Sequence, residues 1–79
     1  MRIDDLTPGV RAPEGCDRIR VERLSSGRFR YWGLASIDGS FIRFAEGDTY
    51  DSADAARSAG IAWAGDMGVG ALIIEHSKD

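Results

Sequence analysis

The chain has 79 residues, of which 43% are apolar and 29% are charged, and its formal net charge at pH 7 is −3. These values are typical of one small globular domain, and they exclude a disordered chain and a simple basic nucleic-acid binder. At this length a domain buries only about 60% of the surface that its unfolded chain exposes, so its stability is marginal.

The composition also narrows the expected location and chemistry. The first ten residues lack the apolar centre of a signal peptide, and no stretch approaches the roughly 20 apolar residues of a membrane-spanning helix. A single cysteine and a single histidine are too few for an internal disulfide or a Cys/His zinc site. We therefore expect a cytoplasmic protein that uses no cofactor and no metal. Nine of the ten basic residues are arginine, which fits a GC-rich bacterial or phage genome.

The first segments in chain order are an arm and three strands. Residues 1–17 hold both prolines and show no sustained periodicity, so we expect an extended arm before a single domain at residues 18–77. In residues 18–24, apolar side chains such as Ile19 and Val21 alternate with charged ones. Residues 28–37 are rich in aromatic and branched side chains. Asp38-Gly39 then separates this run from residues 40–46, and Asp-Gly between two such runs predicts a hairpin with a type I′ turn.

A helix and a last strand follow. Ser52 is a favourable N-cap and Asp54 suits the first helical turn. Mostly small residues then recur at helical spacing, at positions 56, 59, 60, 63 and 67, and residues 71–76 are predicted to form the last strand. The order β-β-β-α-β with a right-handed crossover predicts an α+β fold. Its mixed four-stranded sheet has the strand order 3-2-1-4 (40–46, 28–37, 18–24, 71–76), with the helix on one face.

Hairpin registers that pair Ile37 with Ser40 and Leu24 with Arg28 divide the sheet into two faces. The face expected under the helix carries Ile19, Val21, Phe29, Tyr31, Gly33, Ala35, Ile37, Ile42 and Phe44. The opposite face carries Arg18, Arg20, Glu22, Leu24, Arg28, Arg30, Trp32, Leu34, Phe41 and Arg43. Within the second face, Glu22 is expected to pair with Arg30, and Arg20 to lie within cation–π reach of Trp32.

The second face is the candidate binding surface, because five arginines against one glutamate give it a charge of about +4. Arginines among aromatic side chains bind carboxylates and phosphates and stack on bases. The candidate binding residues are Arg18, Arg20, Arg28, Arg30, Trp32, Phe41 and Arg43. The alternative is that the N-terminal arm or a second copy of the protein covers this face.

No catalytic set is recognisable. His76 has no predictable titratable partner, and Cys16 on the arm has no predictable base. Residues 71–76 are apolar on both sides, which is unusual for an uncovered edge strand, so a homodimer through this strand or through the Trp32 face is expected.

Residues 50–60 place an aromatic residue and a serine, Tyr50 and Ser52, before an Ala-rich helix, after a hairpin and ahead of a short strand. This arrangement resembles small uncharacterised bacterial domains with a hairpin–helix–strand plan. The resemblance covers about half the chain, implies the fold and transfers no functional residue.

Three functions remain open. The leading hypothesis is a non-enzymatic bacterial or phage protein that binds another protein as its regulator or inhibitor. The second is a nucleic-acid-binding module that uses the Arg/Trp/Phe sheet face for single strands. The third is a minor enzyme or ligand-binding subunit that uses His76 and Cys16. None of them involves a membrane.

Overall fold

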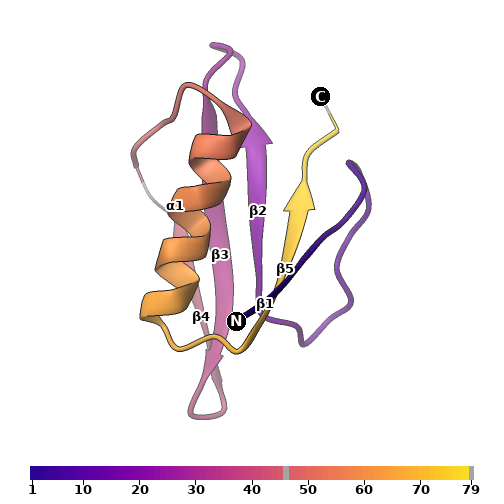
Figure 1. Ribbon diagram of the computed structural model, residues 1–79, viewed down its shortest axis with the longest axis vertical. Coiled ribbons are helices and arrows are strands. Elements are labelled where there is room, and N and C mark those ends of the chain that lie inside the picture. The colour runs from indigo at the N-terminus through magenta and orange to yellow at the C-terminus, as the bar shows by residue number, and fades with distance from the viewer. Residues whose placement is uncertain (46, 79) are drawn as a thin grey trace.

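The computed structural model describes residues 1–45 and 47–78, which form a five-stranded mixed sheet with one helix on one face (Figure 1). The elements in chain order are β1 (Arg2–Asp5), β2 (Arg18–Arg23), β3 (Phe29–Ile37), β4 (Ser40–Ala45), α1 (Ala53–Asp66) and β5 (Ala71–His76). The strand order across the sheet is β1-β5-β2-β3-β4. The pairs β2–β3 and β3–β4 are antiparallel, whereas β5 runs parallel to both β1 and β2.

The fold is α+β as predicted, but the prediction of four strands is wrong. The fifth strand, β1, comes from the segment that the sequence indicates as an arm, and it pairs Ile3 with Leu72 of β5. Its sequence Arg-Ile-Asp-Asp contains a single apolar residue, so it shows no alternation that predicts a strand. The other four strands lie in the predicted relative order.

The predicted hairpin and its registers are confirmed. Asp38 and Gly39 have φ values of 50° and 80°, as a type I′ turn requires, and Ile37 pairs with Ser40. The β2–β3 register pairs Val21 with Tyr31, which is also the predicted pair. The same predicted register pairs Tyr31 with residue 46, which lies outside the described residues.

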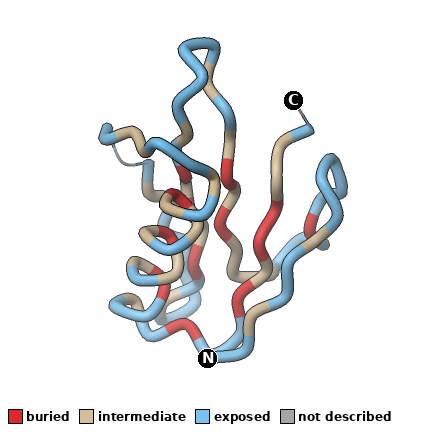
Figure 2. Tube along the Cα trace, turned by 45° about the horizontal axis from the view of Figure 1, so that its top comes forward, coloured by how far each residue is buried: buried red, intermediate tan, exposed pale blue. Residues whose placement is uncertain are grey.

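Helix α1 begins where the sequence predicts, because the Ser52 side chain accepts a hydrogen bond from the backbone N–H of Ala55 at 3.0 Å. The helix covers the predicted core face over β2, β3 and β5, and the buried segments of helix and strands face one another (Figure 2). Ile42 of β4, which was predicted for this face, is 41% exposed because the helix does not reach it. Small residues allow this close approach. A Cβ at Gly60 would lie 2.5 Å from Ile19, and one at Gly33 would lie 2.2 Å from the Trp63 ring.

The last strand, β5, is an internal strand of the sheet. It has β1 on one side and β2 on the other, so the expectation that residues 71–76 form an edge is wrong. Its apolar residues on the helix side are explained within one chain. Leu72 and Ile74 are buried in the core under the helix, and the backbone N–H of Ile73 donates to the carbonyl of Asp17 at the end of the arm.

Gly33 provides a test of the packing between helix and sheet. We predict that Gly33→Ala lowers the free energy of unfolding by about 1–3 kcal/mol, because the new methyl group overlaps the Trp63 ring. Gly70→Ala is the matched control, since no atom lies within 4 Å of its Cβ position. Urea denaturation measures both values. Equal stability of the Gly33→Ala variant and the native protein would contradict the packing.

Candidate functional site

The sheet face turned away from α1, here called the far face, carries the arginines and aromatic residues predicted for it. The β2–β3 register brings Arg20 opposite Trp32 and Glu22 opposite Arg30. The β3–β4 register places Arg43 of β4 opposite Leu34. Since side chains alternate along each strand, these residues share the face opposite the buried Ile19 and Val21.

A buried glutamate that sequence reasoning missed lies on the far face of β5. Glu75 is only 1% exposed. Its Oε1 accepts a hydrogen bond from Nη1 of Arg20 at 3.1 Å, and its Oε2 accepts one from the backbone N–H of Ala12 at 2.7 Å. Burying a carboxylate is costly unless it is paired and hydrogen-bonded, and both conditions are met here.

These bonds fix the segment between β1 and β2 over one part of the far face. Nη1 of Arg18 donates to the carbonyl oxygens of Ala12 and Pro13 at 3.4 and 3.3 Å. Asp17 accepts a hydrogen bond from the backbone N–H of Ser36 at 2.8 Å. In Figure 1 this segment loops out beside β5 and returns to the start of β2. The β2–β5 part of the far face is therefore covered by the chain itself, as one of the alternatives predicted.

Glu22 forms ion pairs with two of the arginines. Its carboxylate accepts hydrogen bonds from Nε of Arg20 at 3.2 Å and from Nε of Arg30 at 3.0 Å, which confirms the predicted Glu22–Arg30 pair. Burial alone would raise the pKa of Glu22, but hydrogen bonds from Arg30 and Trp32 outweigh it and lower the pKa below its ordinary value. Glu22 therefore stays ionised and balances its neighbours.

The β3–β4 part of the far face remains accessible and holds a cation–π pair. The guanidinium carbon of Arg43 lies 5.2 Å from the centroid of the Trp32 ring. Arg43, a diagonal neighbour of Trp32, takes the place expected for Arg20, because Arg20 is held by Glu22 and Glu75. A hollow of 210 Å³ beside this pair is lined by Glu22, Arg30, Tyr31, Trp32, Arg43 and Ala45.

Phe41 lies on the same side of β4, two residues before Arg43, and is 51% exposed. We call the accessible part of the far face the open half, defined by Arg30, Trp32, Leu34, Phe41 and Arg43.

Arg28 is directed away from this group. Its guanidinium forms an ion pair with Asp51 and donates to the carbonyl oxygen of Thr49 at 3.0 Å, both in the loop before α1. We therefore leave Arg28 out of the open half.

The charge of the candidate surface is lower than the sequence indicates. Three of the five candidate arginines contact carboxylates, those of Glu22, Asp51 and Glu75, which leaves about +2 in place of +4. Within the described chain Arg43 has no ion-pair partner, and its guanidinium lies over the Trp32 ring. The open half thus combines the two aromatic rings and Leu34 with one guanidinium that no described carboxylate pairs.

A second cluster lies on the helix face of the sheet. Asp5 at the end of β1 accepts hydrogen bonds from Nε and Nη2 of Arg57 at 2.9 and 2.7 Å. Nε2 of His76 lies 2.9 Å from Oδ1 of the same carboxylate. This partner of His76 could not be predicted from the sequence, because Asp5 belongs to a segment without strand periodicity.

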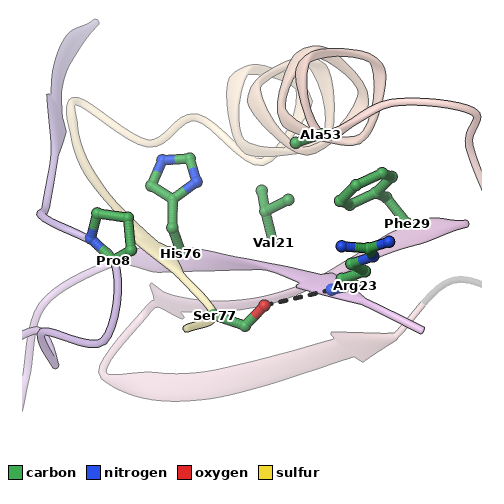
Figure 3. Close-up of a pocket in the computed structure, with 7 residues that line it drawn as sticks. All are labelled: Pro8, Val21, Arg23, Phe29, Ala53, His76 and Ser77. Carbon is green, nitrogen blue, oxygen red and sulfur yellow. Dashed lines mark hydrogen bonds between the residues drawn. The ribbon is translucent and has the colours of Figure 1, made fainter. Parts of the chain in front are cut away.

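A cleft of 230 Å³ adjoins His76, with Pro8, Val21, Phe29, Ala53, Arg23 and Ser77 along its walls (Figure 3). Ser77 accepts a hydrogen bond there from the backbone N–H of Arg23. Cys16 lines a different cleft, beside Asp17 and Ile73. The structure therefore does not bring His76 and Cys16 together. Among residues 1–45 and 47–78, no nucleophilic side chain bonds to His76.

Comparisons with known proteins give no relative from which a function could be carried over: no protein-family model, no curated protein and no solved structure matches this chain. No described helix is long and apolar enough to cross a membrane. The described residues also contain no group of three or more His, Cys, Asp or Glu side chains arranged to hold a metal ion.

Because of the Asp5 cluster, the free energy of unfolding is expected to depend on pH in the acid range. The Arg57 hydrogen bonds, opposed by burial and helped by His76, lower the pKa of Asp5 from 3.8 to about 2. Asp5 is therefore ionised in both the folded and the unfolded state above pH 4, where its full contribution is present. As the pH falls from 3.8 to about 2, the unfolded state binds the proton first and the contribution is lost.

We predict that Asp5→Asn lowers the free energy of unfolding by about 1 kcal/mol at neutral pH, a value reduced for solvent screening of this half-exposed group. The difference from the native protein should disappear by about pH 2. Denaturant titrations between pH 7 and pH 2 measure it. Asp4→Asn, which breaks the exposed pair with Arg2, is the control and should have little effect at any pH. A difference for Asp5→Asn that stayed constant down to pH 2 would contradict the assignment.

Proposed function

We propose that this protein is a non-enzymatic domain that binds another protein through the open half of its far face, as a regulator or inhibitor of that partner. The observation that carries the proposal is the guanidinium of Arg43 over the Trp32 ring, beside an exposed Phe41 and a surface hollow. Tryptophan and arginine are the residues that most often dominate the energy of protein–protein interfaces, and phenylalanine is also enriched there.

The chemistry of the open half defines the expected partner surface. A guanidinium that lies over an indole ring still has N–H groups with which it can donate to a carboxylate. Trp32 and Phe41 offer apolar area on either side of Arg43. The complementary surface is therefore apolar, with at least one Asp or Glu side chain placed to meet Arg43.

Single-stranded nucleic acid is the alternative partner, and base stacking on Trp32 favours it. Such binding also needs several cations that neutralise phosphates. In the open half, Arg30 is already paired with Glu22, and Arg43 alone has no ion-pair partner among the described residues. This charge balance supports a protein partner over a nucleic acid.

We predict that Trp32→Ala and Arg43→Ala each weaken capture of the partner by at least about tenfold, because both truncate the centre of the binding surface. The measurement is affinity capture from an extract of the native host, treated with nuclease, followed by titration of the recovered protein. Arg2→Ala is the matched control, since it removes an exposed arginine from the opposite edge of the sheet.

Labelled single-stranded RNA and DNA are titrated in parallel at two salt concentrations. Binding that falls steeply with salt and is lost in Arg43→Ala would identify the nucleic-acid alternative instead. If both open-half variants remain folded by circular dichroism and capture the same proteins as the native chain, the proposal is wrong.

A further inference from the structure

The outer side of β4 carries backbone groups that no described strand pairs. The two-residue turn at Asp38-Gly39 closes on the pair Ile37–Ser40, and hydrogen-bonded pairs then alternate along the hairpin. Ser40 and every second residue after it therefore bond to β3. The N–H and C=O groups of Phe41, Arg43 and Ala45 point away from β3, at the edge of the sheet.

The two edges of the sheet differ in how they resist pairing with another chain. The β1 edge is four residues long and carries Arg2, Asp4 and Asp5, as expected for an edge that is protected by charge. The β4 edge is six residues long, without proline, and Arg43 is its one charge within Ser40–Ala45. Phe41 and Ile42 on this strand are 51% and 41% exposed. An edge of this kind is normally covered.

The sequence of β4 is complementary to itself in one register. In an antiparallel pair, side chains that lie opposite each other point to the same face of the sheet. A symmetric pair of identical strands meets this condition only when one residue lies opposite its own copy, and the two-fold axis passes between these two copies. Two such registers keep five residues of β4 paired. The register centred on Arg43 places two like charges face to face, which is unfavourable. The register centred on Ile42 avoids this contact.

The register centred on Ile42 also gives each exposed side chain of β4 a favourable neighbour across the interface. Ile42 meets the partner's Ile42 on the helix side of the sheet. Phe41 lies opposite the partner's Arg43 on the far face, within cation–π reach. Ser40 lies opposite the partner's Phe44, where its small side chain leaves room for the ring that stacks on Trp63.

We propose that β4 pairs with β4 of a second copy of this chain, antiparallel and centred on Ile42, so that two five-stranded sheets become one continuous sheet. This interface differs from the two predicted from the sequence, which used residues 71–76 or the Trp32 face. It does not rest on the proposed function. The two-fold axis is perpendicular to the sheet, so both open halves lie on the same side of the dimer.

Sedimentation equilibrium over a dilution series tests the register. Ile42→Glu should weaken self-association by at least about tenfold, because it removes the central apolar contact and brings two carboxylates together. Phe41→Glu is the matched control on the neighbouring, equally accessible position. It places a carboxylate opposite the partner's Arg43 and should leave association unchanged or stronger.

Cysteine cross-linking tests the same geometry directly, in a Cys16→Ser background that removes the native thiol. In the proposed register the two copies of residue 42 form a pair with Cα atoms about 4.5 Å apart, within the range that a disulfide bridges. The two copies of residue 41 are diagonal, about 8 Å apart, and outside that range. Mild oxidation should therefore yield a covalent dimer from Ile42→Cys and not from Phe41→Cys.

Two results would overturn the proposal: a monomer at every concentration reached, or equal cross-linking of the two cysteine variants. Either result would leave the proposed partner-binding function intact, because Trp32 lies on β3, outside the β4–β4 interface, and Trp32→Ala reports on that function in monomer and dimer alike.

Discussion

The arrangement of this small domain depends on one buried carboxylate. Glu75 lies on β5, and its two oxygens join Arg20 on β2 to the backbone of Ala12 between β1 and β2. A buried charge without partners would destabilise the fold strongly, so the covering segment and the sheet stabilise each other. Glu75 thereby holds the segment between β1 and β2 at Ala12, and so determines which part of the far face remains accessible.

The same carboxylate changes the electrostatics of the far face. From the sequence, this face looks like a basic surface suited to nucleic acid. In the folded chain Glu75 and Glu22 hold Arg20, and Glu22 also holds Arg30. Arg43, beside Trp32, has no carboxylate partner among the described residues. This combination of aromatic rings with an unpaired guanidinium is the basis of the proposed protein-binding function.

The hairpins, the helix and the two faces could be predicted because each follows from a local pattern. Asp38-Gly39 fixes one register, and the alternation in residues 18–24 and 28–37 fixes the faces. Strand β1 could not be predicted, since it depends on pairing with β5, which is about 70 residues away. The bonds from Glu75 to Ala12 and from His76 to Asp5 were missed for the same reason: both partners lie in the first 12 residues, which carry no periodic signal.

Amide hydrogen exchange at Ala12 tests the central role of Glu75 most directly. Ala12 lies outside any strand, and its N–H donates to the Glu75 carboxylate. We predict that this amide exchanges as slowly as those of β2 and β5 in the native protein, and that Glu75→Gln accelerates its exchange while the core amides stay protected. Exchange of Ala12 in the native protein at the rate of an unfolded peptide would show that Glu75 does not hold this segment, and would contradict the division of the far face.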